Sequence, residues 1–210
     1  MKQTLGIIDD DPAVLASLTA VFETIGYDVR AFESAQSFLT SLANVEARAS
    51  IDCLIVDLRM PEMTGVELQR HLVEGLATKF PIIVITAYGE VRAAVEALKL
   101  GAEDFIEKPF EDDALVNAVE AAIKRVRSIR ERLQAKEKAE RRLASLSPRE
   151  REILSQVASG SPSKVIAHNL GISRRTVEIH RTNILRKVEA SNLAELIGLV
   201  YLAGSEPDRR

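Results

Sequence analysis

The stretch Cys53-Leu54-Ile55-Val56-Asp57 places an aspartate directly after four apolar residues. A short apolar run of this kind is typical of a buried β-strand. Three more apolar runs lead into a chemically active side chain: Leu5–Ile8 into Asp9-Asp10-Asp11, Ile82–Ile85 into Thr86, and Phe105-Ile106 into Lys108. The repetition of one arrangement at four places indicates a shared site.

A fifth apolar run, Val29–Phe32, completes the set of strands. The segments between the strands, such as 14–25 and 91–98, carry apolar residues three or four positions apart, which is the spacing of a half-buried helix. Alternating strands and helices predict an α/β domain in which helices cover both faces of a doubly wound, five-stranded parallel sheet. The carboxyl ends of parallel strands share one edge, where ligands bind. We therefore expect the polar residues above to meet there.

The side chains expected at this edge suit phosphoryl transfer. Asp57 is a candidate nucleophile, because a carboxylate can accept a phosphoryl group. Asp9 and Asp10 offer the hard oxygen ligands that Mg²⁺ prefers, while Lys108 and Thr86 can contact phosphate oxygens. The alternative is that the acidic run only caps a helix beginning near Pro12, and this reading is favoured for Asp11 alone.

Charge divides the chain of 210 residues into two parts. Residues 1–120 contain 9 basic and 21 acidic residues, whereas residues 121–210 contain 19 basic and 10 acidic residues. An acidic half joined to a basic half suggests a metal or phosphate site in the first and a polyanion, most simply nucleic acid, as partner of the second. We expect domains at 1–120 and 146–204, a linker at 121–145 and a tail at 205–210.

Cys53 is the single cysteine and lies within an apolar run, so an intrachain disulfide is excluded. The sequence contains no leader-like segment and no stretch of about 18 apolar residues that could span a membrane. We expect a cytoplasmic protein without a membrane partner.

The expected linker is helical, and its apolar residues follow a 3-4 alternation typical of a coiled-coil seam. These seam residues are Leu115, Val119, Ala122, Val126, Ile129 and Leu133. Lys136 and Glu140 occupy the next seam positions, which should weaken pairing there. A single solvated helix and a dimeric coiled coil both remain open.

The sequence Ser147-Pro148-Arg149-Glu150 begins the second domain with a capping box. Helices are expected at about 148–159, 162–169, 173–188 and 192–203, giving an all-α domain of four helices.

The helix at 173–188 has two distinct faces. One face carries Arg175, Glu178, Ile179, Thr182 and Arg186, while Val177, Ile184 and Val188 lie on another, which must pack. Short and charged side chains on an exposed face are typical of a helix that enters the major groove of DNA, and the preceding helix and turn complete a helix-turn-helix. The alternative is a solvated face of a bundle that does not bind DNA.

Residues 1–125 resemble a response-regulator receiver domain. The resemblance rests on Ile8–Asp11, Val56–Gly65, Ile85–Ala87 and Gly101–Phe110. It implies that a sensor histidine kinase phosphorylates Asp57, and that Asp9, Asp10, Asp57 and the backbone carbonyl of Arg59 bind Mg²⁺. It further implies a cis Lys108–Pro109 bond and a switch formed by Thr86, Lys108 and Phe105. For Phe105, a place in the ordinary sheet core is the alternative.

Residues 146–203 resemble a LuxR-type DNA-binding domain, and the whole chain is most similar to the FixJ subfamily, in which a glutamate follows Thr-Val as Glu178 does here. Two features depart from that subfamily. Pro162 replaces the usual capping residue of the second helix, so we expect the N-cap to move to Ser161, and the Ala87–Glu90 segment replaces the usual Gly-His-Gly-Asp. The likeness implies a transcription factor that binds promoter DNA as a homodimer once phosphorylated and activates the transcription machinery. Bases would be contacted by Glu178, Ile179 and Thr182, and phosphates by Lys164, Arg175, Arg181 and Lys187.

Two other classes of function fit parts of the sequence. An aspartyl phosphatase would need a general acid two residues after its nucleophile, where this chain has Arg59, which is unsuited to that role. A module that only docks a partner would not need Asp57. We expect a phosphoryl-accepting regulator, not an enzyme, with slow self-dephosphorylation at most.

Overall fold

The computed structural model describes residues 2–42, 51–76, 80–86 and 91–204. The chain forms two compact units, Met1–Ser128 and Ile129–Arg210. In the first unit, a five-stranded parallel sheet has the order β2-β1-β3-β4-β5. Its strands are β1 (Thr4–Ile8), β2 (Asp28–Phe32), β3 (Cys53–Asp57), β4 (Ile82–Thr86) and β5 (Asp104–Glu107). The predicted sheet is confirmed.

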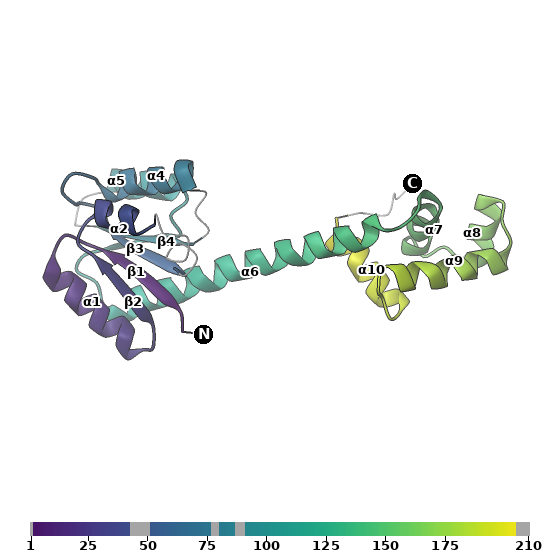
Figure 1. Cartoon of the computed structure of the whole chain (residues 1–210), viewed down its shortest axis with the longest axis horizontal. Helices are drawn as coiled ribbons and strands as arrows, with labels where there is room; N and C mark the ends of the chain where they lie inside the picture. Colours follow the sequence, from purple (N-terminus) through teal and green to yellow (C-terminus); the bar gives the residue numbers. More distant parts are fainter. Residues whose placement is uncertain (1, 43–50, 77–79, 87–90, 205–210) are drawn as a thin grey trace. The chain divides into compact units, whose positions relative to one another are not determined.

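Helices cover both faces of this sheet (Figure 1). Alternate residues of each strand point to opposite faces. Leu54, Val56 and Val84 therefore pack with α2 (Ala35–Ser41), α4 (Gly65–Leu76) and α5 (Val91–Lys99). Cys53, Ile55 and Ile83 pack with α1 (Pro12–Thr24) and the first turns of α6 (Asp112–Ala144). Buried on both faces, the central strands are continuously apolar, which is why they were recognisable in the sequence.

The second unit is helical. Its own core joins the end of α6 to α7 (Pro148–Ala158), α8 (Ser163–Leu170), α9 (Arg174–Lys187) and α10 (Leu193–Leu202). The predicted helices and the capping box of α7 are confirmed. The expected cap of α8 at Ser161 is wrong: Pro162 occupies the N-cap without a side-chain hydrogen bond, because its extended backbone already lets its carbonyl accept the Val165 and Ile166 N–H groups.

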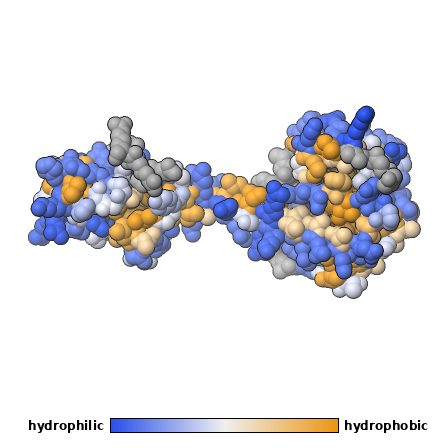
Figure 2. Space-filling model, turned by 180° about the vertical axis from the view of Figure 1, so that it is seen from behind, coloured by the Kyte–Doolittle hydropathy of each residue, from blue (hydrophilic) through white to orange (hydrophobic). Residues whose placement is uncertain are grey.

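The middle of α6 is exposed. Ile129 is 49% exposed and Leu133 is 56% exposed, and Figure 2 shows apolar atoms among charged ones along this stretch. Lys136 and Glu140 form an ion pair of 3.8 Å within the helix. The seam positions Ile129 and Leu133 are therefore accessible to a partner helix. None of the described helices is long and apolar enough to cross a membrane.

Candidate functional site

Asp57 is the last residue of the central strand β3 and is buried. Its carboxylate is held at both oxygens. Oδ2 accepts the N–H of Arg59 at 2.7 Å, and Oδ1 accepts Nζ of Lys108 at 2.5 Å. The loop after β3 is tightly packed, because a Cβ added to Gly65 would lie 2.5 Å from the Asp57 carbonyl oxygen. Sequence and packing thus fix this carboxylate at the carboxyl edge of the sheet.

Asp9 follows β1 at the same edge and is also buried. Its Oδ2 accepts the same Lys108 Nζ at 2.9 Å, and its Oδ1 accepts the N–H of Asp11. Asp11 in turn caps α1, with its side chain accepting the N–H of Ala13 at 2.8 Å. Capping is therefore the structural role of Asp11, as expected. Asp10 is exposed beside them.

Thr86 ends β4, and its backbone carbonyl accepts the N–H of Lys108 at 2.8 Å. The Thr86 residue is buried. The Lys108–Pro109 bond is cis, as the resemblance implied. Phe105 is 40% exposed, so the alternative that placed it in the ordinary sheet core is wrong. The Ala87–Glu90 segment lies outside the described residues.

Burial and the hydrogen bonds between Lys108 and the carboxylates act in opposite directions on the pKa values of Asp57 and Lys108. Burial raises the pKa of the Asp57 carboxyl above its ordinary value, although Lys108 partly offsets that rise. Burial alone would lower the pKa of Lys108, but its hydrogen bonds to Asp57 and Asp9 outweigh burial and raise it. The ammonium therefore stays charged between two carboxylates that would otherwise repel each other.

The donor set at this edge fits Mg²⁺. Asp9 and Asp57 are two buried carboxylates that share one ammonium. Within the described part of the chain, no group of three or more Asp, Glu, His or Cys side chains forms a metal site by itself. Two carboxylates are nevertheless enough, because Mg²⁺ ordinarily binds one or two carboxylates and keeps several waters. Carbonyl oxygens in the same loop, such as that of Arg59, are ligands of the same hard type.

The outer face of α9 has the character that the sequence predicted. Arg175, Glu178 and Thr182 are exposed, and Ile179 is 53% exposed. Val177 and Ile184 are buried against the rest of the unit. Ile179 is not part of the hydrophobic core of this unit, and an exposed apolar residue among charged and hydroxyl side chains suits a surface that contacts bases.

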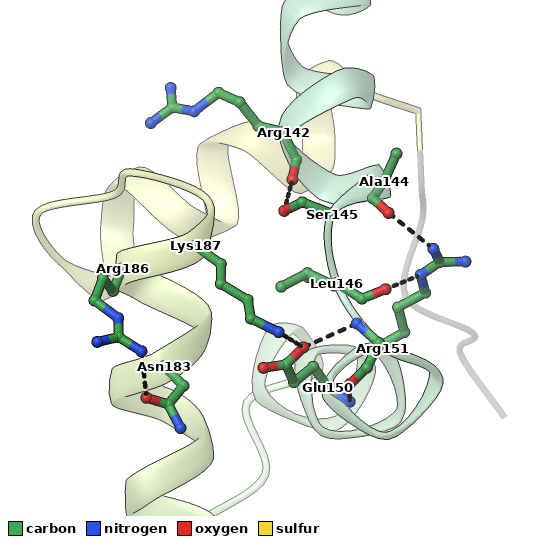
Figure 3. A network of polar contacts seen from close by, with 10 residues as sticks. Arg142, Ala144, Ser145, Leu146, Glu150, Arg151, Asn183, Arg186 and Lys187 are labelled. Carbon is green, nitrogen blue, oxygen red and sulfur yellow. Dashed lines mark hydrogen bonds and ion pairs between the residues drawn. The ribbon is translucent and has the colours of Figure 1, made fainter.

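Two of the basic residues assigned to phosphate contacts are engaged within the domain. Arg181 donates to Oγ of Ser163 at 2.9 Å, and Nζ of Lys187 donates to Oε2 of Glu150 at 2.7 Å (Figure 3). Lys164 is exposed on α8. Sequence reasoning assigned Glu150 to the capping box alone and missed its pairing with Lys187. No local pattern could reveal a contact between residues so far apart in the chain.

Glu150 is a buried carboxylate with several donors around it. The hydrogen bond from Lys187, followed by the N–H of Ser147, lowers its pKa to about 2. Nearby, Arg151 donates to the carbonyls of Ala144 at 3.1 Å and Leu146 at 3.0 Å, joining α7 to the end of α6 (Figure 3). These contacts hold α7 against α9 and against the end of α6.

Comparisons with known proteins agree with this geometry. The response regulator receiver domain family matches residues 5–120, and the luxR family of bacterial regulatory proteins matches residues 144–200. The transcriptional regulatory protein FixJ of Bradyrhizobium diazoefficiens is 40% identical over 203 residues, covering 97% of each chain. FixJ of Rhizobium meliloti is 42% identical, covering 97% of this chain and 98% of the relative.

Solved structures give the same result for the whole chain. The response regulator StyR has a TM-score of 0.76 at 35% identity, covering 96% of this chain and 99% of StyR. Full-length FixJ from B. japonicum has a TM-score of 0.63 at 39% identity and covers 98% of both chains. The chain therefore belongs to the FixJ-like two-component response regulators, transcriptional regulators that join a receiver domain to a LuxR-type DNA-binding domain.

Proposed function

We propose that Asp57 accepts a phosphoryl group from a sensor histidine kinase and that this modification controls DNA binding. The observation that carries the proposal is the contact of one ammonium, Lys108, with both Asp57 and Asp9. A carboxylate oxygen of Asp57 forms a bond to phosphorus while the bond from phosphorus to the kinase imidazole nitrogen breaks. Asp9, Asp10, Asp57 and the Arg59 carbonyl would hold Mg²⁺, which would supply positive charge beside the transferring group.

Phosphorylation changes what Lys108 and Thr86 contact. The phosphoryl group adds roughly −1.5 to −2 charge, so it attracts the Lys108 ammonium and the Thr86 hydroxyl. The movement of Thr86 leaves space into which Phe105 rotates from its exposed position. Repacking of this face shifts the receiver between two states, with the phosphorylated state favouring self-association.

Exposed apolar side chains support a homodimer formed through this face. Val95 is 42% exposed and Leu98 is 39% exposed, and both lie on α5, which contacts β5. Dimerisation brings two C-terminal domains together on a promoter whose half-sites lie about one helical turn apart.

In the DNA complex, Glu178, Ile179 and Thr182 face bases, whereas Lys164, Arg175, Arg181 and Lys187 lie nearer the phosphates. Arg181 and Lys187 also make contacts within the domain. These contacts restrict the positions from which the two side chains approach the DNA backbone. We further propose that the protein acts in the cytoplasm, activates transcription through the transcription machinery, and has no enzymatic turnover beyond slow loss of its own phosphoryl group.

The test compares wild type with Asp57→Asn by sedimentation and by binding to duplexes selected from a random pool, with and without acetyl phosphate and Mg²⁺. We expect phosphodonor to produce dimers and tighter DNA binding in wild type alone. Equal behaviour of the two proteins would instead identify the receiver as a docking module. Sustained hydrolysis of a phosphomonoester would identify a phosphatase.

A further inference from the structure

The last turns of α6 are part of the core of the C-terminal unit. Ala139 is fully buried there, and Leu143 packs against the same hydrophobic cluster. The first turns of α6 contribute Leu115 and Val119 to the core of the receiver. One continuous helix therefore begins in the core of the phosphorylated domain and ends in the core of the domain that carries the recognition helix α9.

Arg142, on the last turns of α6, contacts the C-terminal end of α9. Its Nε donates to the carbonyl of Val188 at 2.5 Å, and its Nη2 donates to the carbonyl of Glu189. Val188 is the C-cap residue of α9, and Glu189 adopts a left-handed φ of 53°. Carbonyls at the end of a helix lack partners within the helix. The guanidinium supplies a donor to the C-cap carbonyl of Val188 and to the Glu189 carbonyl just beyond the helix, and its charge is favourable at a helix C-terminus.

The surroundings of Arg142 make this contact specific. Only 20% of its side chain is exposed, and Nη2 lies 3.8 Å from the Glu195 carboxylate at the start of α10. Lys187, the last residue of α9, is held by Glu150 of α7. The end of the recognition helix is therefore fixed by two side chains, one from α7 and one from the linker helix.

We propose that Arg142 is a positioning residue for DNA recognition, which fastens α9 to α6 so that a change in the receiver reaches α9 along a helix. This inference rests on the proposed function, because it concerns how phosphorylation alters DNA binding. A planar guanidinium can hold two carbonyls at once in a fixed geometry, which a lysine ammonium does less well. Without this contact, the C-terminal end of α9 is held less rigidly to α6, so the two recognition helices of a dimer tolerate different half-site spacings better.

The test uses the full-length protein with Arg142→Gln and a matched control, Arg141→Gln. Arg141 has the same charge on the same helix, but its side chain is 79% exposed and pairs with Glu137 one turn earlier on α6. The probes are a duplex with two half-sites, selected by phosphorylated wild type from a random pool, and the same duplex with about five base pairs inserted, roughly half a helical turn.

We expect wild type and Arg141→Gln to bind the original duplex more tightly after treatment with acetyl phosphate and Mg²⁺, and to lose this gain on the lengthened duplex. In Arg142→Gln the phosphorylation-dependent gain falls at least about fivefold, the lower range of coupling between sites. The variant also distinguishes less between the two duplexes. Arg142→Lys gives an intermediate result.

The inference is overturned if Arg142→Gln keeps the wild-type gain. It is also overturned if binding weakens by one factor with and without phosphodonor while the spacing dependence is unchanged, because the role is then only structural. If Arg142→Gln does not fold, Arg142→Lys is judged by the same criteria. An absence of gain in wild type contradicts the proposed function. In that event, amide hydrogen exchange at residues 186–190 tests the contact itself. Exchange that is as slow in Arg142→Gln as in wild type would show that Arg142 does not hold the end of α9.

Discussion

Glu150 and Lys187 form an ion pair of 2.7 Å, although they lie on different helices of the DNA-binding domain. Glu150 also completes the capping box of α7 by accepting the N–H of Ser147. One carboxylate therefore caps the N-terminus of α7 and holds the C-terminal end of α9. This double role ties the orientation of the recognition helix to the first residues of the domain.

Glu150→Gln should destabilise the C-terminal domain. The substitution keeps the shape of the side chain but removes the negative charge that Lys187 and the N–H of Ser147 contact. Hydrogen bonds to charged groups contribute about 1.5–3 kcal/mol. We expect the opening free energy of α7 and α9, measured by hydrogen exchange, to fall by about 2 kcal/mol. Glu152→Gln is the control, because Glu152 pairs with Arg149 at the surface and should change stability by less than about 1 kcal/mol. Equal effects of the two substitutions would contradict the assigned role.

The same carboxylate predicts a dependence on pH. Its pKa in the folded domain is about 2, below the ordinary value of 4.5. A group with a lowered folded pKa contributes stability that is present above its unfolded pKa and lost as pH falls towards the folded pKa. The stability difference between wild type and Glu150→Gln should therefore shrink as pH falls from about 5 to about 2. If the two proteins instead differed by the same free energy of unfolding throughout that pH range, the pKa of Glu150 would not be strongly lowered in the folded domain.

Two glycines of α4 should respond oppositely to alanine. At Gly65 an added Cβ would meet backbone atoms of Asp57 at 2.5 Å and Leu58 at 3.2 Å, so the loop that positions Asp57 must shift. We expect Gly65→Ala to destabilise the receiver by about 1–3 kcal/mol and to slow phosphorylation by acetyl phosphate. At Gly75 nothing lies within 4 Å, so Gly75→Ala should stabilise the helix by about 0.5–1 kcal/mol. Denaturant melts and phosphorylation rates of both variants measure these effects.

The position of the candidate site could be predicted from the sequence, because the carboxyl ends of parallel strands lie at one edge of the sheet. Apolar runs identify buried strands, and parallel strands bring Asp9, Asp57 and Lys108 to one edge whatever the distance between them in the chain. The outward face of α9 was predictable for a similar reason, because helical period alone separates Ile179 from Val177.

The contacts that join helices of the C-terminal unit could not be predicted in this way. Arg142 reaches Val188, and Lys187 reaches Glu150, through tertiary packing that leaves no period or motif in the sequence. The expected cap at Ser161 failed for a local reason, since Pro162 can end the extended segment without a side-chain cap. The exposure of Phe105 likewise depends on which residues cover the end of β5.

The two kinds of DNA contact should be separable by salt. Lys164→Ala should weaken binding similarly on all sequences and lower the salt slope by about 1, because it removes one phosphate contact. Thr182→Ala should leave the slope unchanged but relax the preference at one base pair, at a cost of about 1–3 kcal/mol. Lys138→Ala, on the exposed part of α6, controls for net charge. A changed slope with Thr182→Ala would contradict its assignment to a base.

Phe105→Ala should separate phosphorylation from its consequence. Phe105 is 40% exposed and lacks any place in the buried core, so its truncation leaves the Asp57 site and the sheet intact. We expect the variant to accept phosphoryl groups from acetyl phosphate at the wild-type rate but to dimerise at least about fivefold less tightly in sedimentation. Val73→Ala is the control, because Val73 is 47% exposed on α4, outside the proposed face, and should dimerise as wild type does. Phosphorylation-dependent dimerisation that survives Phe105→Ala would show that another element carries the switch.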